Sequence, residues 1–358
     1  MSVGIASAVG TFTTAELETI PPGPHDVVVA VGASGICASD HSVLAGHLPF
    51  GLPLVLGHEL AGRVVEVGTD VSRVRVGDRV VGASIPACGR CWWCRRHLKY
   101  LCAQTPAIWA APRYRTDGGH AVSAFCGLGS FAETTTVHEL SVVPVGTDLP
   151  DEQLALIGCG VVTGAGAVFN TARVSPGDEI AVVGAGAVGL AVIQAAAIAG
   201  ASRIVAIEPV PAKRRLAADL GATDVLDPTT TDDVVGTVRD LTAGRGVDAA
   251  FEAAGRVDTT LAAYRMTRAA GTVVAVGAAE ATAVLALGAW EHVSSGRNFT
   301  SAVYGSADID VDFPLLVRLA EAGRLNLERL VSTRIGLSAA DITAAFADTE
   351  SVRSVILP

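Results

Sequence analysis

Residues 179–200 read EIAVVGAGAVGLAVIQAAAIAG. The apolar run Glu179–Val183 predicts a buried strand, and the alanine-rich run after it predicts a helix. Between them, Gly184, Gly186 and Gly189 have the spacing Gly-x-Gly-x-x-Gly. A glycine turn in this position lets the backbone approach a pyrophosphate, which then lies at the helix N-terminus. The pattern therefore predicts a dinucleotide-binding turn, with an ordinary packing turn as the alternative.

The same segment is also apolar enough to suggest a membrane span. Ile180–Ala201 has no charged side chain, and Gln194 is its one polar side chain. Its length would cross a bilayer, but it is rich in alanine and glycine, and Asp178 and Arg203 flank it closely. Because α/β cores read as near-continuous apolar runs, we expect a buried strand, turn and helix, and a cytoplasmic protein that does not enter a membrane.

From residue 178 onward, strands and helices alternate. After the helix Val188–Ala199, the expected strands are Arg203–Ile207, Asp224–Leu226, Val247–Phe251 and Thr272–Val276, and the expected helices are Ala212–Leu220, Asp232–Leu241 and Thr259–Thr267. Repeated β-α-β units of this length predict a doubly wound parallel sheet with right-handed crossovers. The expected fold class is therefore α/β.

An acidic residue stands where a dinucleotide fold needs one. Glu208 follows Gly184 by 24 residues, at the end of the next expected strand. Its carboxylate would accept hydrogen bonds from the adenosine ribose and repel a 2′-phosphate, which favours NAD over NADP. Lys213 follows closely as a further candidate cofactor-binding residue, and because Arg214 and Arg215 stand beside it, NADP remains open.

The rest of the chain predicts a second, β-rich part. The expected elements are strands at Asp26–Val31, Val64–Val67 and Val74–Val81 (the last interrupted by a turn at Gly77-Asp78), an irregular loop at Cys88–Phe131, helices at Pro314–Ala322 and Ala339–Ala347, and a closing strand at Ser354–Leu357. Ser338 and Asp341 are placed to cap the helix that begins at Ala339.

Length and composition limit the classes of protein. A chain of 358 residues has room for two domains, and 50% hydrophobic against 17% charged residues excludes intrinsic disorder. The net charge of −10 argues against a nucleic-acid partner. No Lys or Arg precedes Arg63, so neither a secretory nor a mitochondrial targeting segment is expected.

Four of the seven cysteines form a close quartet with the spacing Cys-x2-Cys-x2-Cys-x7-Cys: Cys88, Cys91, Cys94 and Cys102. Four thiolates suit a tetrahedral structural zinc with no open position. Three neighbouring arginines, Arg90, Arg95 and Arg96, would offset the double negative charge of that centre. An iron–sulfur cluster, disulfides and unrelated free thiols are the alternatives.

Cys37, His58 and Cys159 form a second candidate set, and glycines stand close to each of them. A Cys₂His set leaves the fourth zinc position open for water or substrate, which is the pattern of a catalytic site. Spacing alone does not bring three distant positions together, so a packing role for each residue is the alternative.

These motifs, in this order, resemble those of the zinc-dependent medium-chain alcohol dehydrogenases. The string Gly57-His58-Glu59-Leu60-Ala61-Gly62, continuing to Gly68, Val71 and Gly77-Asp78-Arg79-Val80, is similar to the zinc signature of that family, and the quartet, the glycine turn and Phe251-Glu252 to Gly255-Arg256 also match in order. The resemblance covers nearly the whole chain. It implies a GroES-like catalytic domain of residues 1–162 and 303–358 that contains two zinc sites, and a Rossmann NAD-binding domain of residues 163–302.

The resemblance also implies roles for single residues. At the catalytic zinc it implies three ligands, an occasional fourth and a group that fixes the tautomer of the histidine: Cys37, His58 and Cys159, then Glu59, then Asp40. Ser39 would hydrogen-bond the alcohol and begin a proton relay that ends at His41 or at water. Three residues would contact the nicotinamide or the ribose and phosphates of the cofactor: Thr163, Arg256 and Arg353.

The chain departs from the family pattern at several positions. Ala38 replaces the Arg or His that follows the first zinc ligand in many relatives, and Ser42 replaces the His that often ends the relay. Ser84 and Ala278 fall where relatives often have bulkier residues, which predicts a roomier substrate pocket. The long segment from Cys102 to Phe131 resembles that of dimeric members, so a homodimer is expected.

The leading hypothesis is a zinc-dependent oxidoreductase that transfers hydride between a medium or bulky primary (or secondary) alcohol and NAD. One alternative is a formaldehyde dehydrogenase that depends on glutathione or mycothiol. Another is a nicotinoprotein with tightly bound NAD, to which Ala38 and Glu208-Pro209-Val210 give a faint similarity. A non-enzymatic zinc- and dinucleotide-binding scaffold is disfavoured, because the catalytic donors and Ser39 are all present.

Overall fold

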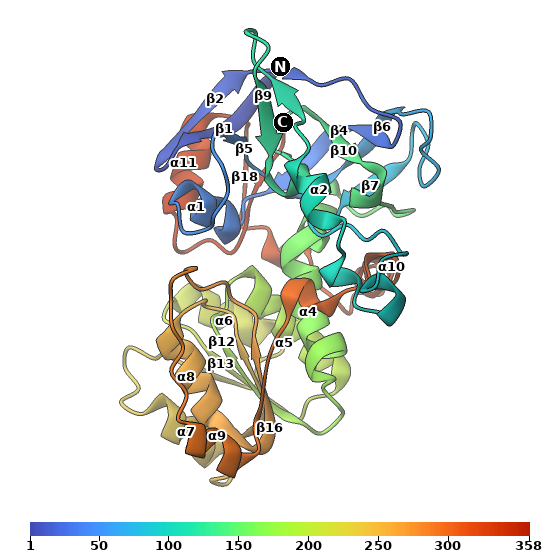
Figure 1. The fold of residues 1–358 in the computed structure, drawn as a ribbon. Coiled ribbons are helices and arrows are strands. Elements are labelled where there is room, and N and C mark those ends of the chain that lie inside the picture. The colour runs from blue at the N-terminus through green and yellow to red at the C-terminus, as the bar shows by residue number, and fades with distance from the viewer. The chain divides into compact units, whose positions relative to one another are not determined.

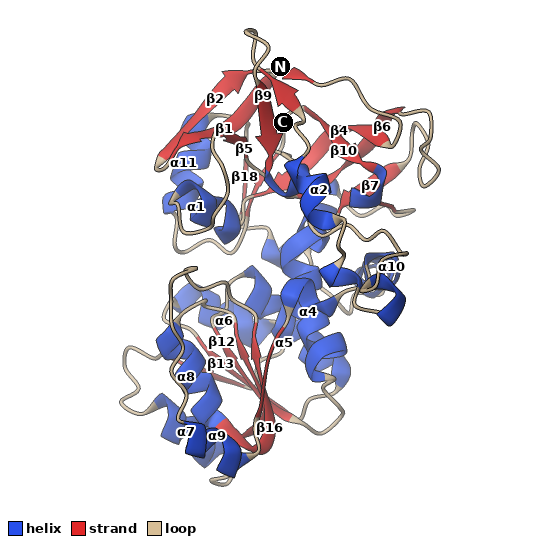
Figure 2. Ribbon diagram, viewed as in Figure 1, coloured by secondary structure: helices blue, strands red, loops and turns tan.

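The glycine turn follows an inner strand of a six-stranded parallel sheet in the computed structural model, which describes residues 1–358 (Figure 2). Its order is β14-β13-β12-β15-β16-β17, with every neighbouring pair parallel. The strands are β12 (Glu179–Val183), β13 (Arg203–Ile207), β14 (Asp224–Leu226), β15 (Val247–Glu252), β16 (Thr267–Ala275) and β17 (Asn298–Ser301). The strand of this sheet that comes first in the sequence, β12, lies inside the sheet, and the strand order reverses there. This is the doubly wound fold, so the predicted fold class is confirmed.

The crossover helices of this sheet are close to those predicted: α5 (Ala187–Ala199), α6 (Pro211–Asp219), α7 (Val234–Leu241), α8 (Val257–Met266) and the additional α9 (Ala289–Ser295). Helix α5 is buried along most of its length. Its one polar side chain, Gln194, is satisfied by the backbone of Asn326, which accepts from Nε2 at 3.4 Å and donates to Oε1 at 2.6 Å. The apolar segment is therefore a core strand, turn and helix.

The three glycines of the turn have different structural reasons. Gly184 has φ +92°, a left-handed conformation that favours glycine. A Cβ at Gly189 would overlap the carbonyl oxygen of Gly184, so glycine is needed for α5 to begin this close to β12. A Cβ at Gly186 would meet no atom within 4 Å. Packing therefore does not explain Gly186, whereas space for a bound pyrophosphate at the helix N-terminus does.

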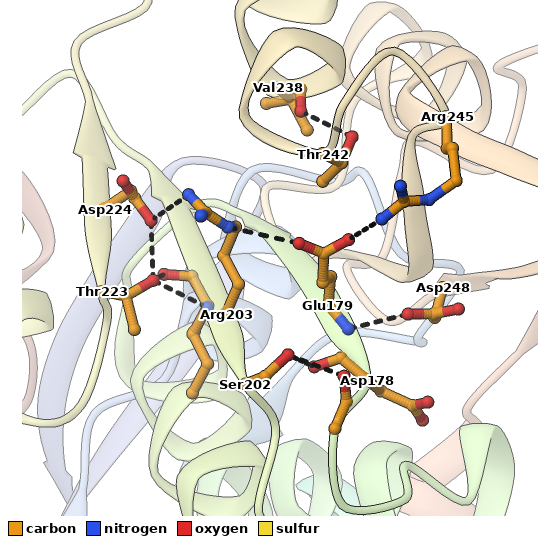
Figure 3. A network of polar contacts seen from close by, with 12 residues as sticks. Asp178, Glu179, Ser202, Arg203, Thr223, Asp224, Val238, Thr242, Arg245 and Asp248 are labelled. Atoms are coloured by element: carbon orange, nitrogen blue, oxygen red, sulfur yellow. Dashed lines mark hydrogen bonds and ion pairs between the residues drawn. The ribbon is translucent and has the colours of Figure 1, made fainter.

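Charged pairs hold the opposite ends of these strands (Figure 3). Glu179 at the start of β12 pairs with Nε of Arg203 at 3.4 Å and with Nη2 of Arg245 at 3.0 Å. Arg203 also pairs with Asp224 at 3.1 Å, and the backbone N–H of Glu179 donates to Asp248 at 2.8 Å. These residues stand at or near the starts of the strands. They therefore stabilise the amino-terminal ends of the strands, which are opposite to the glycine turn.

The chain divides into two compact units (Figure 1). The first comprises Met1–Cys159, Asp308–Gly323 and Leu327–Pro358, and the second comprises Gly160–Ala307 and Arg324–Asn326. These limits fall a few residues from the expected domain boundaries, which remain predictions.

The first unit is built on two sheets. One has the order β2 (Thr11–Glu16), β1 (Ser2–Ala8), β5 (Leu54–Val55), β9 (Ala121–Ala124), β8 (Tyr114–Arg115) and β3 (Glu18–Thr19). The other has the order β11 (Val142–Pro144), β7 (Arg79–Gly82), β6 (Glu59–Val67), β4 (Asp26–Gly35), β19 (Ser354–Ile356) and β18 (Thr333–Ile335), with β10 (Thr134–His138) also paired to β4. The pairing of β4 with β6 and β19 brings the segment before Cys37 beside Glu59 and Arg353.

The helices of the first unit are α1 (Ala38–Leu44), α2 (Thr105–Ala110), α3 (Asp151–Leu156), α10 (Ile309–Glu321) and α11 (Ala339–Ala347). Helix α11 has the predicted bounds, and Ser338 caps it by accepting from the backbone N–H of Asp341 at 3.1 Å. Helix α3 continues through two π-helical segments and α4 (Val162–Gly166) to Ala172. By length and hydropathy alone, Asp151–Ala172 could cross a membrane, but 72% of the apolar window is buried in the protein, as in a core helix.

Three local predictions were wrong. The strand expected at Val74–Val81 is only β7, Arg79–Gly82: the predicted turn at Gly77-Asp78 is present, but no strand directly precedes it, and Asp78 accepts there from the backbone of Arg75 at 3.0 Å. The expected loop Cys88–Phe131 contains α2, β8 and β9. Helix α10 begins at Ile309, before the expected start at Pro314, because Asp308 caps it.

The glycine turn yields a test with a matched pair of variants. Gly189→Ala should destabilise the cofactor-free protein by about 1–3 kcal/mol, because its methyl group overlaps the Gly184 carbonyl oxygen. Gly186→Ala should unfold at nearly the wild-type temperature but bind NAD more weakly, because its methyl group enters open space. Thermal unfolding and NAD titration measure the two effects, and equal destabilisation by both variants would contradict this distinction.

Candidate functional site

The structure brings Cys37, His58 and Cys159 together within the first unit. Their two sulfur atoms and a nitrogen of the imidazole lie within 4.8 Å of one another. Cys37 is the N-cap of α1, His58 precedes β6, and Cys159 lies in the π-helical segment Ile157–Val161. Three positions that are distant in the sequence therefore form one cluster.

Glycines make this convergence possible. Gly57 has φ +93°, and a Cβ there would collide with the backbone of Phe131. A Cβ at Gly158 would stand 2.5 Å from the carbonyl oxygen of Gly82, so the helix that carries Cys159 packs directly against β7. Both positions require close backbone approach, as the sequence suggested.

Asp40 organises the cluster from a fully buried position. Its Oδ2 accepts from the backbone N–H of Cys37 at 3.0 Å, and its Oδ1 accepts from the N–H of Gly57 at 2.9 Å. The same Oδ1 lies 3.2 Å from Nδ1 of His58. Because the carboxylate can only accept, Nδ1 carries a proton, and Nε2 is the nitrogen that can offer a lone pair to a metal ion.

The ionisation of the cluster follows from these contacts. The hydrogen bond with Cys159 lowers the pKa of Cys37 well below the usual thiol value, although burial opposes this. The same hydrogen bond, together with burial, raises the pKa of Cys159 well above the usual thiol value. Burial disfavours the charged form of His58, but the Asp40 carboxylate raises the pKa of His58 well above its usual value. Without a cation, the cluster thus holds protons that a metal ion would displace.

This donor set fits zinc. Nε2 of His58 is buried and has no hydrogen-bond partner, which is costly unless a metal takes its lone pair. Two sulfurs and one imidazole nitrogen supply three of the four zinc positions and leave one open. The neighbouring carboxylate on Nδ1 is the partner that zinc-binding histidines usually have.

Glu59 and Arg353 lie behind this cluster and are both buried. Nη2 of Arg353 pairs with Oε1 of Glu59 at 3.2 Å, and Nη1 donates to the carbonyl oxygen of Ile36 at 2.8 Å. Burial raises the pKa of Glu59 to about 7. In this structure, Arg353 holds the backbone next to Cys37, while its expected contact with the cofactor stays a prediction.

Ser39 and His41 are both on α1 but make different contacts. Oγ of Ser39 lies 3.8 Å from Sγ of Cys37. The exposed ring of His41 lies 5.7 Å from the ring of Phe346 on α11. Residues two apart project from different faces of a helix. The geometry therefore brings Ser39, and not His41, to the donor cluster.

The cysteine quartet also converges, with its four sulfur atoms within 4.8 Å of one another. Sγ of Cys88 and Sγ of Cys94 are 4.0 Å apart, close to the edge of about 3.8 Å of a tetrahedron with Zn–S bonds of about 2.3 Å. Backbone N–H groups point at the sulfurs; that of Cys88 donates to Cys102 at 3.2 Å. Such bonds lower the pKa of Cys91 to about 6, while burial raises that of Cys94 to about 12. The quartet fits a four-coordinate zinc.

In the second unit, Glu208 is buried at the end of β13 and supports the glycine turn. Its Oε2 accepts from the N–H of Ala185 at 2.7 Å, and its Oε1 accepts from the N–H of Val210 at 2.9 Å. Each oxygen retains acceptor capacity for a ribose hydroxyl. The guanidinium of Arg214 donates to the carbonyl oxygen of Glu208 at 2.7 Å and pairs with Asp227 at 2.7 Å, so it is not free to meet a 2′-phosphate.

The other expected cofactor residues lie in the second unit. Thr163 is buried on α4, and Lys213 lies on α6. The exposed Arg256 pairs in a fork with Asp258, at 2.9 Å for both bonds. Their contacts with a cofactor stay predictions.

Sequence reasoning missed the aromatic surroundings of His58. The ring of Phe125 meets the imidazole edge to face at 4.8 Å, and Phe50 contacts Phe125 at 4.9 Å. Trp109 donates from Nε1 to the carbonyl oxygen of Ser84 at 2.8 Å, next to Phe50. No local pattern indicates these neighbours, because they come from separate segments of the chain.

Comparison with known proteins gives the same assignment over most of the chain. Residues 23–151 match the alcohol dehydrogenase GroES-like domain, and residues 187–321 match the zinc-binding dehydrogenase domain. An S-(hydroxymethyl)glutathione dehydrogenase of Synechocystis is 37% identical over 353 residues, covering 95% of each chain.

Solved structures agree. An alcohol dehydrogenase zinc-binding domain protein from Burkholderia ambifaria is 33% identical with a TM-score of 0.93, covering 100% of this chain and 98% of its own. The benzyl alcohol dehydrogenase of Acinetobacter calcoaceticus is 29% identical with a TM-score of 0.91, covering 99% and 98%. Two zinc ions and NAD fit this family and the donor sets described above. The chain therefore belongs to the zinc-dependent medium-chain alcohol dehydrogenases and is an oxidoreductase.

Proposed function

We propose that this enzyme oxidises a medium or bulky primary (or secondary) alcohol to its aldehyde or ketone, with NAD⁺ reduced to NADH and one proton released. The observation that carries the proposal is the convergence of the buried Cys37 and His58 with the partly buried Cys159, which leaves one coordination position open. Zinc at that set would supply Lewis acidity that lowers the pKa of a bound alcohol, and NAD would supply the hydride acceptor.

The remaining steps belong to residues of the chain. Ser39 accepts the hydroxyl proton of the alcohol at Oγ and passes its own proton on. Asp40 keeps a proton of His58 on Nδ1, so that Nε2 is the nitrogen available to coordinate zinc. Glu59 is proposed as an occasional fourth ligand. Water is the proposed end of the relay, because the ring of His41 turns towards Phe346.

Cofactor-binding roles are proposed for the glycine turn, for Glu208 and for four further residues. Gly184, Gly186 and Gly189 would admit the pyrophosphate, and Glu208 would accept from the ribose hydroxyls. Four further contacts are proposed with the nicotinamide, ribose and phosphates: Thr163, Lys213, Arg256 and Arg353. The hold of Arg214 on backbone carbonyls and on Asp227 supports NAD over NADP.

A homodimer and a cytoplasmic location complete the proposal. Trp290 and Val293 on α9 are 81% and 73% exposed, and β17 is an edge strand of the same sheet, which supports a second copy on this face. Sedimentation should give twice the chain mass of 36.4 kDa. All seven cysteines are free thiols, which suits a reducing compartment.

A thiol-dependent formaldehyde dehydrogenase is the second candidate, because the relative that is 37% identical carries the name S-(hydroxymethyl)glutathione dehydrogenase. In this reaction the hemithioacetal of formaldehyde with glutathione or mycothiol would be the alcohol that is oxidised.

A substrate panel tests the proposed function and separates it from this candidate. NADH absorbance should rise with benzyl alcohol and with medium-chain alcohols in the absence of any thiol. Formaldehyde with glutathione, and formaldehyde with mycothiol, form the comparison arms. Turnover only in those arms would favour the thiol-dependent reaction, and no turnover in any arm would refute the dehydrogenase proposal.

The two metal sites should respond differently to loss of one ligand. Cys91→Ser should lower the unfolding temperature, because metal-binding free energy at a structural site is folding free energy. Cys159→Ser should abolish turnover and leave unfolding nearly unchanged. Metal analysis should give two zinc ions in the wild type and one in each variant. The buried Cys126, outside both sets, supplies the control Cys126→Ser; one zinc in the wild type would contradict the assignment.

Ser39→Ala tests the first step of the relay. General acid–base steps contribute about 10²–10⁴-fold, so kcat for alcohol oxidation should fall by about that factor. His41→Gln is the matched control, and its pH profile should overlay that of the wild type. A loss of activity in His41→Gln mainly at low pH would restore His41 as the end of the relay.

Glu208→Gln tests cofactor choice. Removing the negative charge should weaken NAD binding and narrow the preference over NADP, because the repulsion of a 2′-phosphate is lost. Values of kcat/KM for both cofactors measure the change. Wild-type turnover with NADP that equals turnover with NAD would show that Glu208 does not select the cofactor.

A further inference from the structure

The segment Cys88–Cys102, called here the quartet lobe, exposes two adjacent tryptophans. Trp92 is 56% exposed and Trp93 is 38% exposed. Their rings meet at 4.7 Å with an interplanar angle of 78°, and the guanidinium of Arg96 lies 4.0 Å above the ring of Trp92. Neither the zinc donor set nor the dinucleotide turn uses these three side chains.

The charged side chains of the sequence segment that holds the tryptophans are all of one sign. No Asp or Glu occurs between Asp78 and Asp117, whereas seven Lys and Arg residues do. The whole chain has net charge −10, so the residues outside this interval carry −17. One segment of an otherwise acidic chain therefore carries only basic charged residues.

Four of the seven cations have partners within the unit: Arg79 with Asp151, Lys99 with Asp308, Arg113 with Asp26, and Arg115 with Glu18. The other three, Arg90, Arg95 and Arg96, are exposed and make no ion pair. They stand in the quartet lobe beside the tryptophans. Part of their charge would offset that of a zinc–thiolate centre, but this leaves the exposure of both tryptophans unexplained.

Hydrogen bonds and an ion pair hold the backbone of the quartet lobe. The backbone N–H groups of Cys88 and Gln104 donate to Sγ of Cys102 at 3.2 and 3.4 Å. Lys99 fixes the far end of the lobe to Asp308 at 2.8 Å. A preformed surface loses little conformational entropy on binding, and exposed Trp and Arg are the residue types that dominate protein–protein binding energy.

The chemistry of the surface selects its partner. An extended polyanion, such as a nucleic acid or an anionic membrane, would also face the acidic remainder of the chain. A short acidic segment with an aromatic or aliphatic side chain would meet only the three arginines and the tryptophans. We propose that the quartet lobe docks such an acidic protein segment, whose apolar side chain covers Trp92 and Trp93 and whose carboxylates pair with Arg90, Arg95 and Arg96.

The test uses the zinc-loaded full-length enzyme and a labelled peptide that repeats Glu-Glu-Phe, with binding followed by fluorescence anisotropy. The peptide should bind at an ionic strength of about 0.01 M and weaken as salt screens the charges. A Lys-Lys-Phe peptide should not bind, and a Glu-Glu-Ser peptide should bind at least about tenfold more weakly, because it lacks the apolar contact.

Two double variants address the lobe itself. Trp92→Ser with Trp93→Ser, and Arg95→Ser with Arg96→Ser, should each weaken Glu-Glu-Phe binding at least about tenfold. Val76→Ser and Arg265→Ser, both exposed and outside the quartet lobe, are the controls and should bind as the wild type does. Unfolding temperature and zinc content verify that the lobe remains folded in every variant.

Three outcomes would overturn the proposal: no binding of Glu-Glu-Phe by the wild type, wild-type affinity in both lobe variants, or lobe-dependent binding of phosphatidylserine vesicles in place of the peptide. The last would assign the surface to a membrane. None of these outcomes bears on alcohol oxidation, because no lobe residue in the test touches the proposed catalytic site.

Discussion

The proposed catalytic donor set depends on one buried carboxylate. Asp40 is fully buried, and it accepts from the backbone of Cys37, from the backbone of Gly57 and from Nδ1 of His58. Burying an uncompensated carboxylate costs on the order of several kcal/mol, and these three donors offset that cost. One side chain thereby joins the start of α1, the turn before β6 and the imidazole, and it decides which ring nitrogen faces the other two donors.

Close backbone approach is the second constraint, and it acts in both units. Gly158 allows the helix with Cys159 to touch β7, and Gly189 allows α5 to begin against Gly184. Gly158 precedes the proposed zinc ligand Cys159, and Gly189 lies in the first turn of α5, at whose N-terminus the pyrophosphate is proposed to bind. The contact that packs each element therefore also places its proposed binding group. Gly186 differs, because nothing in the protein fills the space above it.

The sequence predicts well what depends on neighbouring residues. The bounds of β12, β13 and α11 follow from short apolar runs and from a cap, and they agree with the structure. The sequence does not predict the helix Asp151–Ala172, because its glycines lower the helix propensity. Burial in the protein stabilises this helix, and no local pattern indicates it. The cysteine quartet is readable because its members lie close together in the chain.

The spacing of residues in the sequence cannot predict which distant segments pair in the fold. Residue types suggested Cys37, His58 and Cys159, but their convergence requires the pairing of β4 with β6 and the packing of Gly158 on Gly82. The contact of Arg353 with Glu59 requires β19 to pair with β4, and the orientation of His41 towards α11 requires the packing around Phe346.

The most direct test of the central role of Asp40 is the zinc affinity of Asp40→Asn, measured by competition with a chelator. The asparagine amide can donate to Nδ1 of His58, which moves the imidazole proton to Nε2 and removes the lone pair that the metal needs. One of the two zinc ions should then bind about 10–100-fold more weakly, while the quartet zinc is retained. Asp70→Asn, on an exposed carboxylate, is the control. Wild-type affinity for both zinc ions in Asp40→Asn would contradict the account.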